Sequence, residues 1–163
     1  MCALLALVLA APPAAAAPCR LDKVAIDPLD GPHGDRWRGA HAGVDVLFHN
    51  DVADHPVTVF PEPPMTVRVA AGAHECRVDD GGVWARDGVW LSADGRTLVT
   101  SESSGSALDL VFRDTGTCAK VGTVDVSGLQ WRIQGAAVVL LRTSGKGTDR
   151  RVRLDATCRP GSP

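Results

Sequence analysis

The sequence predicts an all-β fold, an antiparallel β-sandwich or small barrel of about ten short strands in a single domain. Three observations support this class. Short runs of alternating apolar and polar residues recur between Gly, Pro, Asn and Asp turn signals, and no window carries a helical period of useful length. At 163 residues the chain has the length of one domain.

The first half of the chain offers short strands between stretches rich in glycine and proline. Within 65–70, Met65, Val67 and Val69 alternate with Thr66 and Arg68, the pattern of a half-buried strand. Residues 27–43 combine Gly, Pro, Asp and His and are expected to form a long loop. The strands expected in this half are an edge strand at 21–26 and three further strands at 44–48, 57–60 and 65–70.

Three Asp-Gly pairs, spaced by seven residues, predict a meander in the middle of the chain. Asp80-Gly81, Asp87-Gly88 and Asp94-Gly95 each separate apolar runs, and Asp-Gly favours the two-residue type I′ hairpin turn. With these turns one side of the sheet carries Trp84, Val89, Leu91 and Leu98, and the other side carries Val83, Ala85, Trp90 and Val99.

The second half continues with strands expected at 107–113, 120–126, 129–133, 136–141 and 151–155. The run 136–141 is continuously apolar, which indicates a strand covered on both faces. The predicted core comprises Leu91, Leu98, Leu108, Leu110 and Phe112.

The N-terminus predicts export. Residues 1–16 read as a signal peptide with a ten-residue apolar segment, Cys2 to Ala11, which is too short to span a bilayer, and a cleavage position after Ala16. A basic n-region is missing, which leaves open whether the natural start lies upstream. Residues 17–163 would then form the domain. Pro18 before Cys19 argues against a lipid anchor on that cysteine, because a lipobox has a small residue there.

Four cysteines remain after the predicted cleavage, namely Cys19, Cys76, Cys118 and Cys158. An even number in an exported chain predicts two disulfides. Three pairings are possible, and the sequence does not choose among them. The pairing of neighbours along the chain, Cys19 with Cys76 and Cys118 with Cys158, is slightly favoured.

Charge gives no indication of a nucleic-acid partner. The charged fraction is 22% and the formal net charge is −2, values typical of a soluble globular domain. The charge is nevertheless uneven, because basic residues outnumber acidic ones from Arg142 onward. This C-terminal stretch is interpreted as a solvated strand face, with an anionic surface partner as the alternative.

Histidines gather before residue 60 beside several aspartates and suggest a metal site. His41, His49 and His55 are the candidate ligands for zinc or copper, set against ordinary loop histidines because no HxH or HExxH spacing occurs. The stretch 46–59 resembles the strand, loop and histidine of the cupredoxin family, with His55 in the position of the first copper ligand. No histidine follows His74 and no methionine follows Met65. The resemblance therefore implies a sandwich without copper.

Other motifs carry no chemistry of their own. Residues 90–116 resemble one blade of a β-propeller, but no second copy occurs, which indicates a shared hairpin. Residues 144–148 lack the glycine spacing of a phosphate loop. The serines of 101–106 form a polar loop without a nucleophile elbow. No cofactor is predicted.

The sequence thus predicts an exported, non-enzymatic binding module whose partner is a protein or small ligand in the cell envelope. Trp90, with Val83 and Val99 on the same side of the sheet, is the candidate binding group if that side is uncovered. A metal-binding protein that uses the N-terminal histidines is one alternative. A partner that neutralises a toxin or hydrolase in the envelope is another.

Overall fold

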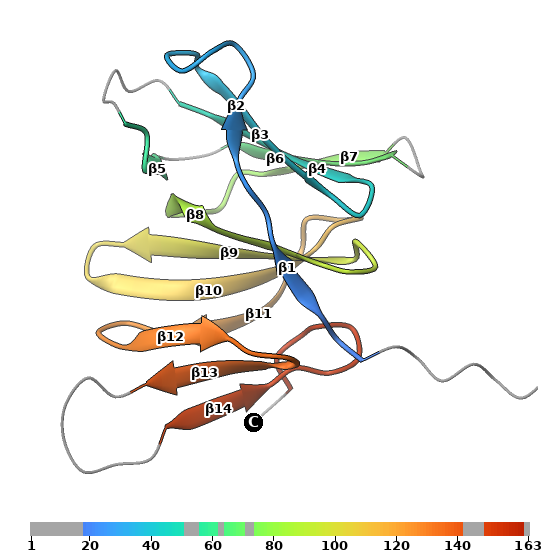
Figure 1. Ribbon diagram of the computed structural model, residues 1–163, viewed down its shortest axis with the longest axis vertical. Helices are drawn as coiled ribbons and strands as arrows, with labels where there is room; N and C mark the ends of the chain where they lie inside the picture. Colours follow the sequence, from blue (N-terminus) through green and yellow to red (C-terminus); the bar gives the residue numbers. More distant parts are fainter. Residues whose placement is uncertain (1–17, 51–55, 62–63, 71–73, 142–148, 162–163) are drawn as a thin grey trace, which may run out of the picture.

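Three antiparallel sheets build the protein and lie one after another along its long axis (Figure 1). The computed structural model describes residues 18–50, 56–61, 64–70, 74–141 and 149–161. The N-terminal sheet has the order β2 (Asp27–Pro28), β3 (Arg36–His41), β4 (Val44–His49), β6 (Met65–Val69) and β7 (His74–Val78). The predicted all-β class is confirmed, and the sheets form a sandwich-like stack instead of a closed barrel.

The central sheet connects the other two. Its order is β1 (Leu21–Lys23), β8 (Val83–Ser92), β9 (Thr97–Ser104), β10 (Ala107–Asp114) and β11 (Lys120–Asp125), and β5 (Val59–Phe60) pairs with β8 as well. The C-terminal sheet consists of β12 (Gln130–Ile133), β13 (Ala137–Leu141) and β14 (Arg150–Arg153). None of the described residues belongs to a helix that is long and apolar enough to cross a membrane.

Each face of the central sheet buries its own hydrophobic cluster. Leu98 of β9 lies in the cluster shared with the N-terminal sheet, whereas Val99, the next residue, lies in the cluster shared with the C-terminal sheet. Both side chains are fully buried because successive residues of a strand point to opposite faces. The predicted division into two sides is confirmed for Trp84, Val89, Leu91 and Leu98 against Val99 and Trp90.

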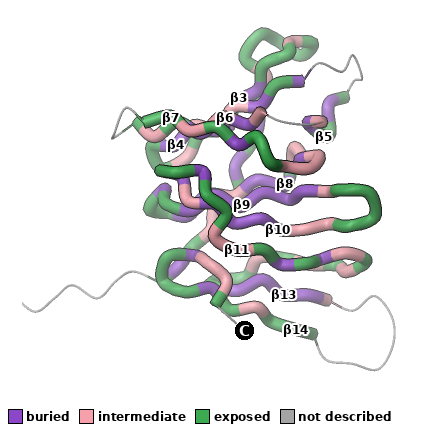
Figure 2. The backbone as a smooth tube through the Cα atoms, turned by 180° about the vertical axis from the view of Figure 1, so that it is seen from behind, coloured by how far each residue is buried: buried purple, intermediate pink, exposed green. Residues whose placement is uncertain are grey.

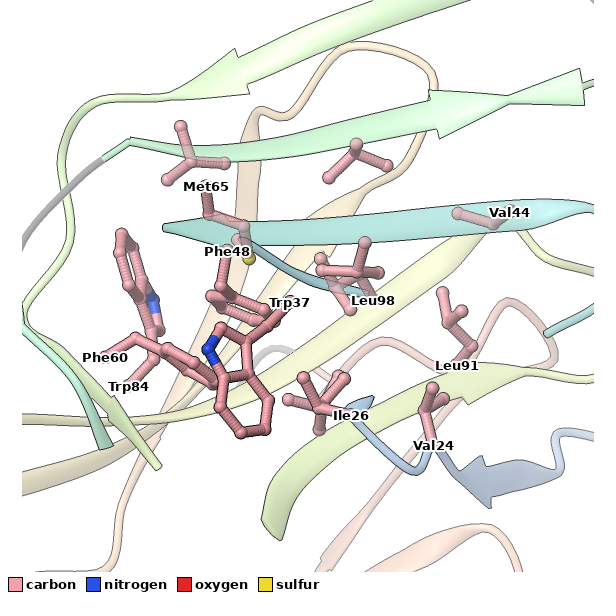
Figure 3. Packing of buried hydrophobic residues seen from close by; sticks show 14 of the residues in the cluster. Val24, Ile26, Trp37, Val44, Phe48, Phe60, Met65, Trp84, Leu91 and Leu98 are labelled. Atoms are coloured by element: carbon pink, nitrogen blue, oxygen red, sulfur yellow. The ribbon is translucent and has the colours of Figure 1, made fainter. Parts of the chain in front are cut away.

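The cluster against the N-terminal sheet contains four aromatic side chains among aliphatic ones (Figure 3). The rings of Phe48 and Phe60 stack with centroids 4.5 Å apart, and Trp37 and Trp84 lean against them at tilted angles. Of the predicted core, Leu91 and Leu98 belong here, whereas Leu110 and Phe112 belong to the second cluster and Leu108 packs against that one. The predicted single core is therefore two cores.

The predicted long loop at 27–43 is wrong in its second half, where β3 pairs with β4 along its whole length. Trp37 and Gly39 point inward, and a Cβ on Gly39 would lie 2.4 Å from Ile26 Cδ1 and 2.6 Å from Val24 Cγ1. Since a glycine occupies the inward position, the apolar alternation that marks a strand is hidden there. The polar strand β7 was missed for a similar reason, because most of its side chains lie outside the core.

Two of the three predicted Asp-Gly turns are not hairpins. Residues 85–88 lie opposite Ser101 alone, as a bulge within the continuous strand β8. Gly88 is required there because a Cβ would lie 2.6 Å from the Ser101 Cβ. Asp80-Gly81 leads into β8, where a Cβ on Gly81 would meet the Trp84 ring at 2.2 Å. Only Asp94-Gly95 turns the chain into a hairpin, and it gives the predicted pairing of Leu91 with Leu98 and Trp90 with Val99.

The Asp94-Gly95 turn differs in type from the prediction. A type I′ turn needs positive φ at both central residues, whereas here only Gly95 has positive φ, at +71°. The Gly95 N–H donates to the Ser92 carbonyl at 2.8 Å, and the Thr97 N–H donates to Ser92 Oγ at 2.9 Å. The loop therefore spans four residues between β8 and β9 and keeps the predicted register.

Both predicted disulfides form, but the favoured pairing is wrong. Cys19 bonds Cys158, and Cys76 bonds Cys118. The first bridge fastens the chain before β1 to the segment after β14, and the second joins β7 of the N-terminal sheet to the turn after β10. Neighbours along the sequence are not paired because the fold places Cys19 beside the C-terminal segment. The Cys19 sulfur is thus engaged by Cys158.

Candidate protein-interaction surface

Trp90, the predicted binding anchor, is half-buried and lies against the C-terminal sheet. Its indole meets that of Trp131 on β12 edge to face, with ring centroids 5.3 Å apart, and Lys23 Nζ lies 5.9 Å from the Trp90 ring centroid. Val99, its cross-strand neighbour, is fully buried. Of the three predicted residues, Trp90 and Val83 therefore keep partial solvent exposure, whereas Val99 has none.

Val83 lies apart from Trp90, at the opposite end of β8. It pairs with Ser103 of β9, and Ser103 Oγ donates to the Val83 carbonyl at 3.4 Å. Val59 of β5, an exposed apolar side chain, is nearby in the same sheet because it pairs with Ala85. Val83 and Val59 thus add apolar surface beside the turn between β9 and β10.

That turn is the longest run of exposed residues in the described part of the central sheet (Figure 2). Residues 104–107, which we call the hairpin tip, are all exposed. Ser104 pairs with Ala107, so that only Gly105 and Ser106 form the turn. Gly105 has φ +58° and Ser106 does not have positive φ, which is the combination of a type II′ turn. The predicted polar loop at 101–106 is therefore a tight hairpin, since β9 continues to Ser104.

A buried ionic network holds the base of this hairpin. The side chain of Arg113 on β10 is 2% exposed and that of Glu102 on β9 is 8% exposed, and Arg113 Nη2 lies 3.6 Å from Glu102 Oε1. Thr100 Oγ1 donates to the same Glu102 oxygen at 2.7 Å. Arg113 also donates to the Asp80 carboxylate at 3.0 Å and to the Asp80 carbonyl at 2.9 Å. Side-chain bonds on one face thus join both strands of the hairpin to the β7–β8 connection.

Beside the bulge of β8 lies a groove of about 550 Å³. It separates the ends of β1 and β5, which pair with β8 on either side of the bulge. Arg86 lines this groove and is itself fixed, because it donates to the carbonyls of Ile26 and Val57 and stacks 4.6 Å above the Trp37 ring. The guanidinium therefore closes one wall of the groove.

The structure separates two of the predicted metal ligands. His41 is at the end of β3 that pairs with Val44, whereas His49 pairs with Arg36 at the other end of the same hairpin. His41 Nε2 lies 3.1 Å from Asp22 Oδ2, and His49 Nδ1 lies 4.0 Å from Asp35 Oδ2. His55 lies outside the described residues. Within the described part of the chain, His, Cys, Asp and Glu form no group of three suited to a metal ion.

Sequence reasoning did not single out the hairpin tip, Val59 or the Glu102–Arg113 pair. The serines of the tip predict a polar loop and no further role, because a serine-rich turn carries no chemical signature. The ionic pair could have been suspected from charged residues within two apolar strands, since a charge inside a core strand is rarely left unpaired.

Comparisons with known proteins agree on one family. Residues 23–154 match the family model described as immune protein Tsi1. A relative from Pseudomonas aeruginosa, named immune protein Tsi1, is 37% identical over 143 residues, which cover 86% of this chain and 83% of the relative. The matched range includes the hairpin tip, the groove and strands β2 to β14.

Proposed function

Because the chain belongs to the immune protein Tsi1 family, we propose that it protects the cell that makes it by binding and neutralising a protein toxin. This function corresponds to the alternative in which an exported β domain neutralises a toxin. The observation that carries it is the family match over most of the chain.

The hairpin tip is the proposed contact with the toxin. Residues 104–107 are small or polar and exposed, so they can enter a concave site without a large desolvation cost. The Glu102–Arg113 pair and the eight cross-strand pairs of β9 and β10 hold the tip in one conformation. A preorganised element loses little entropy on binding, which favours affinity. Val83 and Val59 supply apolar surface at the border of the contact.

The compartment proposed for this encounter is the cell envelope. Residues 1–16 would direct export and be removed, which leaves residues 17–163 as one domain. Two disulfides support this compartment, because they persist in oxidising environments and are rare in the bacterial cytosol.

Affinity capture from an envelope extract tests the function directly. The mature chain is the bait, and the captured protein is then produced alone in the envelope of a host that lacks this chain. We expect growth arrest that co-production of the chain relieves. A captured protein that is harmless to the host, or whose toxicity the chain leaves unchanged, would contradict the proposal.

Matched variants test the contact surface. Ser106→Arg places a long charged side chain at the tip, and Thr123→Arg places the same side chain at an exposed position of β11. We expect Ser106→Arg to weaken toxin binding at least about tenfold and to reduce protection, because a clash at a central contact is rarely accommodated. Thr123→Arg should bind as the unmodified chain does. Equal binding by both variants would remove the tip from the interface.

A further inference from the structure

Each described arginine of the N-terminal and central sheets has a hydrogen-bond acceptor or a carboxylate partner within the same chain. Arg86 donates to two backbone carbonyls. Each of the others lies within 4 Å of a carboxylate: Arg20 with Asp22, Arg36 with Asp30, Arg38 with Asp45, Arg68 with Glu75, Arg77 with Asp79, Arg96 with Asp94, and Arg113 with Asp80 and Glu102. In these two sheets the guanidinium charge is thus neutralised or hydrogen-bonded locally.

The C-terminal sheet departs from this rule. Arg132 on β12 and Arg151 and Arg153 on β14 are exposed, and none of them lies within 4 Å of a carboxylate among the described residues. Among the described residues, Arg151 donates to the Gln134 side-chain oxygen alone, at 3.2 Å. We call these three residues the arginine face. Their charges add to the excess of basic residues in the C-terminal part of the sequence.

Strand register places the three arginines on one surface. Arg132 and Arg151 pair with Val139 of β13 from either side, and Arg153 pairs with Ala137. Trp131, Val138, Leu140 and Val152 belong to the core on the other side of this sheet, so the arginines point away from it. From standard strand spacing, Arg132 and Arg151 are about 10 Å apart across the sheet, and Arg153 is about 7 Å further along β14.

The arginine face offers charge without an apolar anchor. Val139 is 1% exposed and Ala137 is 7% exposed. Arg132 and Arg151 flank Val139 in register. Protein interfaces concentrate their binding energy in buried aromatic and apolar anchors. A face of guanidinium groups without carboxylate partners on a small sheet matches instead a surface of anionic lipid headgroups. Such headgroups diffuse in the membrane, so a phosphate can reach each arginine.

We propose that the arginine face binds the anionic phospholipid headgroups of a membrane surface and so holds the protein reversibly at the membrane. The C-terminal sheet forms one end of the molecule (Figures 1 and 2), whereas the hairpin tip belongs to the central sheet. Each arginine near an anionic bilayer raises partitioning about fivefold, so the three together contribute on the order of 100-fold at low salt. Binding of this size is weak, reversible and sensitive to ionic strength.

Vesicle co-sedimentation provides the test. The probes are vesicles of phosphatidylethanolamine with about one quarter phosphatidylglycerol, and vesicles in which phosphatidylcholine replaces the anionic lipid. We expect the unmodified chain to bind the anionic vesicles at about 50 mM salt, to be released at about 500 mM, and to ignore the neutral ones. Equal binding to both vesicle types would overturn the proposal.

Matched triple variants separate the arginine face from net charge. Arg132→Gln/Arg151→Gln/Arg153→Gln should lower partitioning on the order of 100-fold. Arg38→Gln/Arg68→Gln/Arg77→Gln removes the same charge from carboxylate-paired sites of the N-terminal sheet and should change it by less than about threefold. Replacement of the three face arginines by lysine keeps the charge and should keep most of the binding, so that a loss in the glutamine triple is assigned to the missing charge and not to the missing guanidinium groups.

Three outcomes would overturn the inference. Equal losses in both glutamine triples would indicate bulk charge. Full inhibition by soluble glycerol phosphate at the same phosphate concentration would indicate a small-anion site instead of a membrane surface. Unchanged vesicle binding in the face variant, together with lost toxin binding, would indicate an acidic protein partner. The first two outcomes are measured with vesicles and need no toxin, so they are independent of the proposed immunity function.

Discussion

Trp90 of the central sheet and Trp131 of the C-terminal sheet meet edge to face, with ring centroids 5.3 Å apart. Both residues pack against the cluster that joins these two sheets. An edge-to-face pair places the positive ring edge against the negative ring face, which adds an electrostatic term to the buried area. The pair therefore fastens the C-terminal sheet to the rest of the protein at the border of that core.

A double-mutant cycle on this pair should show direct coupling. We expect Trp90→Ala to lower the free energy of unfolding by about 2 kcal/mol, because the side chain is half-buried and its removal takes away the ring that Trp131 meets edge to face. The coupling energy between Trp90→Ala and Trp131→Ala should be about 1 kcal/mol. Urea denaturation of the four proteins measures both values. Strictly additive losses would show that the rings do not stabilise each other.

Removing each disulfide should destabilise the protein in the order of loop length. Cys76 and Cys118 are 42 residues apart, and Cys19 and Cys158 are 139 apart. The chain-entropy model gives losses of about 4 and about 5 kcal/mol for the corresponding double serine variants. Denaturation without reductant measures the two. A larger loss for the shorter loop would show that packing around Cys118 outweighs chain entropy.

Breaking the buried ion pair at the base of the hairpin should cost more than deleting it. Arg113→Met leaves Glu102 buried without its cation, and we expect the free energy of unfolding to fall by about 3 kcal/mol or more. Arg113→Met/Glu102→Leu removes both charges and should recover part of that loss, because Asp80, the other partner, is exposed and can be solvated. Urea midpoints decide the order. A double variant less stable than the single one would contradict this account.

Acid should destabilise the protein through its capped turns. A hydrogen bond from the Thr157 hydroxyl is the main cause that lowers the pKa of Asp155; burial opposes this, and the backbone N–H groups of Arg159 and Thr157 add to it. The Ser127 backbone and side chain lower the pKa of Asp125 similarly. A depressed folded-state pKa contributes stability above the unfolded value of about 3.9, and this stability disappears as pH falls through the folded value.

The urea midpoint should therefore fall as pH drops below about 4. Asp155→Asn should flatten part of this decline, since the amide oxygen still accepts hydrogen bonds but carries no charge. Asp149→Asn is the control, because the described structure gives Asp149 no hydrogen bond. Identical pH profiles of the urea midpoint for the unmodified chain and Asp155→Asn would show that the Asp155 turn does not contribute to the loss of stability in acid.

The interior of the central sheet was predictable from sequence because strand alternation is local. Leu98 and Val99 are adjacent in sequence and belong to opposite cores, as period-two patterning requires. The candidate surface was harder to predict. The sequence suggests Trp90 as a binding anchor because the apolar alternation predicts which side of the sheet a residue faces. The alternation does not predict what covers that side. Asp87-Gly88 looked like a turn because a bulge and a turn both require a residue without a side chain.

The sequence by itself determined the all-β class, the two sides of β8 and β9 and the presence of two disulfides, since these depend on neighbouring residues and on a count of cysteines. Only the tertiary structure decided that a third sheet covers Trp90, that Cys19 pairs with Cys158 and that Arg132, Arg151 and Arg153 lack carboxylate partners. Each of these three features depends on which segments, distant in the sequence, lie side by side in the fold. That arrangement results from the packing of a further sheet on each face of the central sheet.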